Sequence, residues 1–179
     1  MKITDRPPLS LAARVMIFVG LAIGLSLILI GSLLLSAVER HFAEQDAGEL
    51  AVMTQAVAKT LLNGGNDSAQ QSDALANAIS GHHGVFFQVR KAQGDIIYSM
   101  PGANLTQVTD TLAPTSEINV ENVQTWQDGD KTFRGVVSDV EVGGRSYSIT
   151  TAIDMGFHLE FLRSFRRALW LIMTLAGAI

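Results

Sequence analysis

Residues 15–38 read VMIFVGLAIGLSLILIGSLLLSAV, and this stretch decides how the rest of the chain is placed. It contains no charged residue and no Asn, Gln, His or Pro. A helix needs about 20 apolar residues to cross the hydrocarbon core of a bilayer, and this run is longer. In lipid, a helix satisfies its backbone hydrogen bonds within the segment. We therefore predict a transmembrane helix at residues 15–38.

A cleaved signal peptide is the alternative interpretation of this run, because Lys2, Arg6 and Arg14 would supply a basic start. The apolar part of a signal peptide has about 7–15 residues, fewer than are present here. Residues 35–38, LSAV, also lack a clear cleavage site between small residues. The membrane span is the better interpretation.

The end of the chain, residues 168–179, is a second apolar run that reads ALWLIMTLAGAI. It is too short to span a bilayer, and Trp170 near its start suits a membrane interface. We predict the start of a second transmembrane helix that is truncated in this chain. A C-terminal amphipathic helix lying on the membrane is the alternative.

The orientation follows from the basic residues, which favour the cytoplasmic side of a membrane. Residues 1–14 hold three of them and are predicted to be cytoplasmic. Residues 39–167 would then form one domain in the periplasm of a bacterial inner membrane, or its equivalent. The three arginines at positions 163, 166 and 167 argue against this orientation unless their long side chains reach lipid phosphates.

Charge and composition exclude some partners and sites. The net charge is −4, and three of the 13 basic residues but only one of the 17 acidic residues precede the first span. The outer segment is thus more acidic than the whole chain, which disfavours nucleic acid as a partner. The chain has no cysteine, so it forms neither disulfides nor thiolate metal sites.

The first part of the outer segment is predicted to be helical. Apolar residues at three- and four-residue steps continue from the first span to Val57 and Leu61, with one gap at Asp46, and Asn63-Gly64 ends the pattern. A second helix is predicted from residue 67 or 68 to Gly81.

The remainder is predicted to be a sheet. Strands are expected at residues 85–90, 96–98, 119–127, 132–142 and 147–153, with residues 101–114 as a loop that holds at most a short helical turn. Asp128-Gly129 and Gly143-Gly144 predict tight hairpin turns. A helix resumes at Phe157. This order predicts an α+β fold in which helices cover one face of a mostly antiparallel sheet.

Histidines are the candidate functional residues, because the chain has no Walker A loop, GxSxG elbow or HExxH motif. At 1.5 Å per residue, His41 would lie about 10 Å above the first span and His158 about 15 Å above the second. Imidazoles that converge there would suit copper, zinc or nickel. For either histidine alone, an amphipathic ring resting at the interface is the plain alternative.

Weaker candidates are thioethers, an aromatic residue and two further histidines. Met100 and Met155 could add soft ligands. His82 and His83 follow Gly81 in a predicted loop, where adjacent histidines are more often solvated than ligating. Phe42, beside His41, is most simply a packing residue.

Three stretches carry a family resemblance: RHFAEQD at residues 40–46, the hairpin at 85–99 that ends in GDIIYS, and DMGFHL at 154–159. With them, the chain resembles the N-terminal sensor part of bacterial heavy-metal sensor histidine kinases of the copper/silver type. The resemblance implies a PAS-like sensor domain in a homodimer of two-span subunits. It also implies a metal site near the membrane at the dimer interface, with His41 and His158 at the matching positions and Phe42 as the accompanying aromatic.

The resemblance further implies a copper ion as the ligand, with Cu(I) favoured over Cu(II) and Ag(I). The family's kinase part, which binds ATP and acts on a response regulator, is absent from this chain, so no residue here would be catalytic. Metal binding would shift the relative height or rotation of the two membrane helices, and this shift would alter the autokinase activity on the other side of the membrane. A small-molecule sensor with structural histidines is the alternative, and a non-signalling membrane anchor is a third possibility.

Overall fold

The computed structural model describes residues 10–64, 68–78 and 84–177. The chain forms two compact units. The first, which we call the helical unit, consists of Met1–Glu39 and Glu160–Ile179, and the second, the sheet unit, of Arg40–Leu159. Each is described by itself.

The helical unit is built from the first part of helix α1, Leu11–Asn63, and the last part of helix α4, Gly156–Gly177. Within the part of the chain that the structure describes, α1 alone is long and apolar enough to cross a membrane. Its large apolar side chains are open in this unit, with Met16 76% and Phe18 74% exposed. Residues 15–38 are helical as predicted, and both membrane spans stay predictions.

The two helices of this unit pack at Gly31. A Cβ atom there would lie 3.1 Å from the sulfur of Met173 and 3.3 Å from a methyl group of Leu169. Small residues allow such close helix approach in membrane proteins. A long ion pair also links the two helices: the Arg166 guanidinium of α4 lies 3.9 Å from the Glu39 carboxylate of α1.

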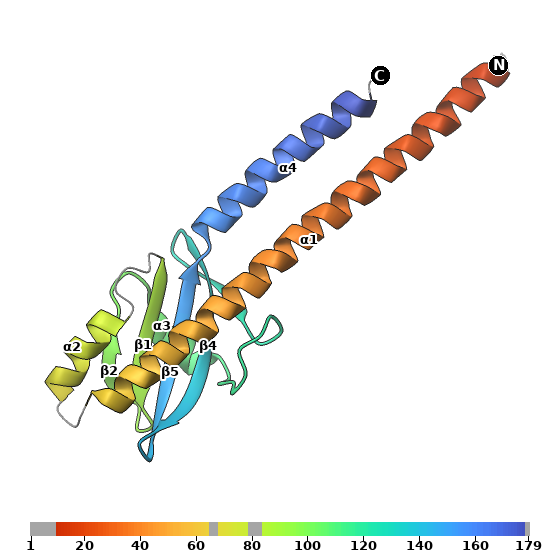
Figure 1. The fold of residues 1–179 in the computed structure, drawn as a ribbon. Helices are drawn as coiled ribbons and strands as arrows, with labels where there is room; N and C mark the ends of the chain where they lie inside the picture. The colour runs from red at the N-terminus through yellow and green to blue at the C-terminus, as the bar shows by residue number, and fades with distance from the viewer. Residues whose placement is uncertain (1–9, 65–67, 79–83, 178–179) are drawn as a thin grey trace, which may run out of the picture. The chain divides into compact units, whose positions relative to one another are not determined.

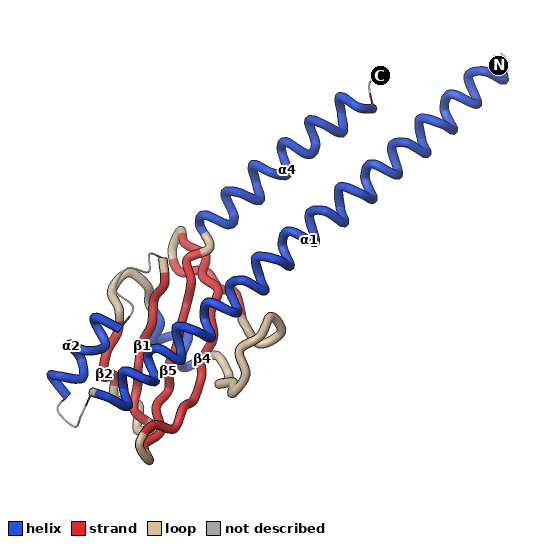
Figure 2. Tube along the Cα trace, viewed as in Figure 1, coloured by secondary structure: helices blue, strands red, loops and turns tan. Residues whose placement is uncertain are grey.

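The sheet unit contains one five-stranded antiparallel sheet (Figure 2). Its strands run in the order β2-β1-β5-β4-β3. Their bounds are Val85–Lys91 for β1, Ile96–Ser99 for β2, Gln124–Asp128 for β3, Lys131–Val142 for β4 and Arg145–Asp154 for β5. Both predicted tight turns are confirmed, with positive φ angles of 63° at Gly129, 59° at Gly143 and 74° at Gly144.

Strand β3 is shorter than the strand predicted at residues 119–127, since it begins only at Gln124 and ends at Asp128. The Asn119 side chain accepts hydrogen bonds from the backbone N–H groups of Glu121 and Asn122, both at 3.0 Å. An Asn that bonds the following backbone in this way stabilises a turn rather than a strand.

One face of the sheet is covered by α1 and by α2, Ser68–Ala78, as Figure 1 shows for α1. The predicted stripe of α1 forms the main core with the inward residues of β1, β4 and β5. Thr54 and Thr151 share a buried hydrogen bond of 3.0 Å across this interface. The helix residues in this core are Leu50, Met53, Val57, Leu61 and Leu75.

The opposite face is covered as well, which corrects the prediction of a sheet with helices on one face only. Helix α3, Leu105–Thr111, occupies the predicted loop at residues 101–114. Leu105 packs against Phe133 and Ala152, and the hydroxyls of Thr109 and Thr150 lie 2.6 Å apart. The segment has two buried apolar residues, Leu105 and Val108, among turn-forming residues. Two residues are too few to show a helical period in the sequence.

Helix α4 begins directly after β5. The Asp154 carboxylate accepts the N–H of Gly156 at 2.9 Å, and Leu159 donates its N–H to the carbonyl of Met155. A side chain that bonds a free N–H in this way stabilises the start of a helix. His158 is therefore held in the first turn of α4.

Candidate metal-binding site

His158 and Phe42 meet ring on ring in the sheet unit. Their ring centroids lie 4.5 Å apart with an interplanar angle of 22°. Phe42 belongs to α1 and His158 to α4, so the contact joins the two ends of the sheet unit. Such a stack fixes the plane of the imidazole.

Asp46 lies at the edge of the same imidazole. Its side chain is 1% exposed, and its Oδ1 atom lies 3.4 Å from Nδ1 of His158. Among the described residues, neither of these two buried atoms has a hydrogen-bond partner, so their 3.4 Å contact is an ion-pair distance and not a formed hydrogen bond. The other oxygen, Oδ2, accepts a hydrogen bond of 2.7 Å from Nη1 of Arg134 in β4.

The gap that Asp46 makes in the apolar stripe of α1 is thus not a solvated position. Phe42 and Asp46 are four residues apart and share one face of the helix, which is the face toward the sheet and the start of α4. The sequence argument missed Asp46 and Arg134 as site residues. An acidic residue that interrupts an apolar stripe was the available signal, whereas nothing marked Arg134.

His41 lies beside Phe42 on α1, but it is exposed. Its ring centroid is 6.5 Å from that of Phe42. The two predicted histidines therefore flank the same phenylalanine. Within the described ranges, no group of three or more His, Asp or Glu side chains is close enough to hold a metal ion.

Of the weaker candidates, Phe42 lies at this point as the stacking partner of His158. Met155 is 5% exposed, and Met100 packs against the main core of the sheet. His82 and His83 lie outside the described residues. The aromatic partner of His158 on its own helix, Phe157, is 76% exposed at a centroid distance of 6.1 Å.

The donor set fits a soft or borderline metal ion in part. Nδ1 of His158 is buried against a carboxylate, so Nε2 is the nitrogen left for an outside ligand. Imidazole nitrogens suit copper and zinc. One chain offers His158 and the exposed His41, fewer protein ligands than most transition-metal sites have. Further ligands would have to come from elsewhere.

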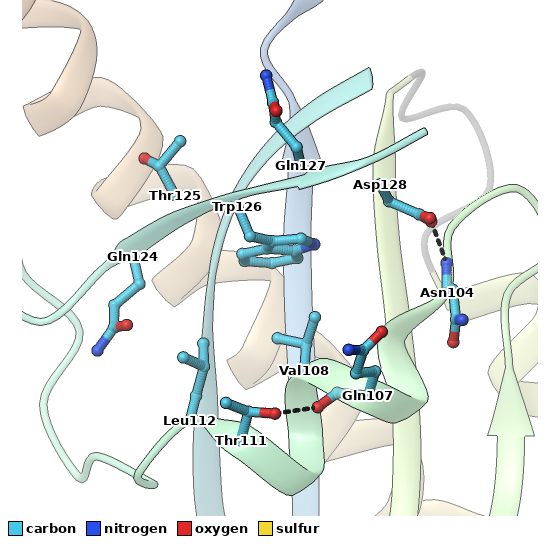
Figure 3. Close-up of a pocket in the computed structure, with 10 residues that line it drawn as sticks. All are labelled: Asn104, Gln107, Val108, Thr111, Leu112, Gln124, Thr125, Trp126, Gln127 and Asp128. Atoms are coloured by element: carbon cyan, nitrogen blue, oxygen red, sulfur yellow. Dashed lines mark hydrogen bonds between the residues drawn. The ribbon is translucent and has the colours of Figure 1, made fainter. Parts of the chain in front are cut away.

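A shallow cleft lies between α3 and β3, well away in sequence from both histidines (Figure 3). Its volume is about 190 Å³, below the roughly 300–1,000 Å³ of small-molecule pockets. The indole of Trp126 lies above Val108, and the Asp128 carboxylate accepts the N–H of Asn104 at 2.9 Å. It is one of several hollows of the sheet unit in which a small-molecule ligand could be sought.

The family model described as the CusS sensor domain matches residues 7–162. The chain belongs to the CusS sensor domain family. The predicted resemblance to copper/silver sensor histidine kinases is thereby confirmed.

Two curated relatives place the family match in longer proteins. "Probable sensor kinase SilS" of Salmonella typhimurium is 23% identical over 183 residues, covering 92% of this chain and 37% of that protein. "Sensor histidine kinase CusS" of Escherichia coli (strain K12) is 29% identical over 96 residues, covering 54% of this chain and 20% of that protein. The match to this chain therefore covers 37% of the first relative's length and 20% of the second's.

The crystal structure of the CusS sensor domain with silver bound is similar in fold. It superposes with a TM-score of 0.51 and 22% identity, covering 69% of this chain and 97% of that one. This likeness confirms the predicted α+β class, a long N-terminal helix with a five-stranded antiparallel sheet.

Proposed function

We propose that this chain is the sensor part of a membrane-bound histidine kinase that responds to periplasmic copper, with Cu(I) favoured over Cu(II) and Ag(I). The stack of His158 on Phe42, directly beside His41, carries the proposal. It joins the two His-bearing stretches that are 117 residues apart in sequence into one surface. The family membership and the silver-bound relative support the choice of metal.

The missing ligands would come from a second copy of the chain in a homodimer. His41 is exposed, and the described residues of its own chain do not supply a group of three or more His, Asp or Glu side chains that could hold a metal ion. A second subunit would add another His41, His158 and Phe42, with Met155 and Met100 as weaker candidates. Coordination that is satisfied in only one arrangement of the helices would provide the differential affinity that a switch requires.

The relay would pass through the two helices that bear these histidines. Both α1 and α4 continue beyond the sheet unit, and we infer that they enter the inner membrane as two spans around a PAS-like domain. The kinase part beyond this chain would bind ATP and phosphorylate a response regulator. The signal would control metal resistance.

Silver titration of the chain in lipid nanodiscs tests this proposal. We expect His41→Ala and His158→Ala each to weaken Ag(I) binding by more than 100-fold, because removing a ligand costs more than the about 10–100-fold of removing a supporting residue. The free metal is set by a competing chelator, and Cu(I) is measured the same way under anaerobic conditions. The matched control is His82→Ala/His83→Ala, which should bind as the unaltered chain does.

Wild-type affinity in both single variants would contradict the proposal. It would favour the small-molecule sensor with structural histidines, for which the cleft between α3 and β3 is one place to search. Loss of binding in the control variant alone would move the site to His82 and His83.

A further inference from the structure

We propose that Asp46 is a positioning residue for metal capture: its carboxylate, held by Arg134, accepts the Nδ1 proton of His158 and presents Nε2 as the metal donor. This inference rests on the proposed function and extends it by two residues.

The placement of the charges supports this role. A carboxylate that is 1% exposed requires compensation, since an isolated buried charge is costly. Arg134 is 17% exposed and occupies only one oxygen of Asp46, at 2.7 Å. The second oxygen lies 3.4 Å from Nδ1 of His158 and has no hydrogen-bond partner among the described residues. The pair with Arg134 therefore leaves one acceptor aimed at the imidazole.

The chemistry of the two groups determines the tautomer. An ionised carboxylate can only accept hydrogen bonds, and a neutral imidazole has one N–H donor and one acceptor nitrogen. The nitrogen that faces Asp46 must therefore carry the proton. Since that nitrogen is Nδ1, the lone pair of the neutral ring resides on Nε2.

The imidazole ring of His158 is contacted both on one face and at its Nδ1 edge. Phe42 covers one face of the imidazole, while Asp46 engages its Nδ1 edge. A metal-binding histidine generally donates its second N–H to a carboxylate, a carbonyl or water, which fixes its tautomer and raises its basicity. The Asp46–His158 pair has the form of that arrangement before any metal is bound.

The tautomer of His158 can be read without metal. We would label the 179-residue chain with ¹⁵N-histidine, embed it in nanodiscs and record two-bond ¹H–¹⁵N correlations at a pH where the ring is neutral, assigning His158 from its loss in His158→Ala. We expect the Nδ1–H form in the unaltered chain. In Asp46→Asn the amide can donate to Nδ1, so the proton should move to Nε2.

The metal readout should follow the tautomer. Asp46→Asn should weaken Ag(I) binding by about 10–100-fold, less than His158→Ala does. The matched control is Asp110→Asn, which also removes a carboxylate paired with an arginine, Arg90, but at a 62% exposed position. It should change neither the tautomer nor the affinity.

A folding defect is separated from positioning by a second variant. Asp46→Asn/Arg134→Met removes both charges of the pair and so avoids leaving the buried one unpaired. This double variant should fold, as judged by circular dichroism. Like Asp46→Asn alone, it should show the Nε2–H tautomer of His158 and weakened Ag(I) binding.

An Nε2–H ring in the unaltered chain, or Ag(I) binding in Asp46→Asn that equals wild type while His158→Ala abolishes it, would overturn this inference alone. Ag(I) binding that is insensitive to His158→Ala would refute the proposed function, whatever the tautomer.

Discussion

Replacing Arg134 by Met should lower the free energy of unfolding by about 3–5 kcal/mol, because it leaves the Asp46 carboxylate buried without its cation. The side chain of Asp46 is 1% exposed, so water cannot take the place of the guanidinium. We would measure urea unfolding of the chain in detergent micelles. A Trp170→Phe background leaves Trp126 in β3 as the fluorescent reporter of the sheet unit.

The control for this prediction is Arg40, an exposed arginine on α1. Arg40 pairs with Glu44 at 2.9 Å, but their side chains are 79% and 52% exposed. Arg40→Met should therefore cost less than about 1 kcal/mol. The double variant Asp46→Asn/Arg134→Met should recover much of the loss, since no unpaired charge remains. Equal losses in Arg134→Met and Arg40→Met would contradict the structural role of the buried pair.

Gly135→Ala should also destabilise the sheet strongly, at or above the upper end of the about 1–3 kcal/mol that overpacking costs. A Cβ atom at this position would clash with the carbonyl oxygen of Thr151 in β5. It would also lie 2.7 Å from the indole of Trp126 and 2.9 Å from Cα of Ala152. Two of these three atoms belong to backbone, so the strand itself would have to move.

Gly135 is needed because Trp126 crosses over it to stack on Phe133, with ring centroids 6.0 Å apart. The same unfolding experiment measures the effect, with a shift in Trp126 emission as a second readout. Gly48→Ala on α1 is the matched control. Nothing lies within 4 Å of its added methyl group, and Ala should raise helix stability by about 0.5–1 kcal/mol. A neutral Gly135→Ala would show that β4 and β5 can separate at low cost.

The extent of α1 and both tight turns were predictable from the sequence, because each depends on neighbours within a few residues. The apolar stripe of α1 ends where Asn63 ends the helix. The glycines at positions 129, 143 and 144 adopt the positive φ angles that their turns require. The strand β4 was equally clear, since the alternation of Val136, Val140 and Val142 is local.

Helix α3 could not be predicted in the same way. Its seven residues are too few to show a helical period, and a helix of that length is stabilised mainly by what it packs against. Leu105 is 1% exposed only because Phe133 and Ala152 lie beneath it. Those partners are brought there by the sheet.

The sequence by itself predicted the long helix, the α+β class and the two candidate histidines, because these follow from local periodicity and from distance along the chain to the two apolar runs. Only the tertiary structure decided how the site is built. It joins Asp46 to Arg134 across 88 residues and places Asp46 beside His158. A charged side chain becomes buried through partners that are distant in sequence. The role of Asp46, the gap in the apolar stripe of α1, is therefore visible only in the folded structure, where residues of β4 and α4 contact it.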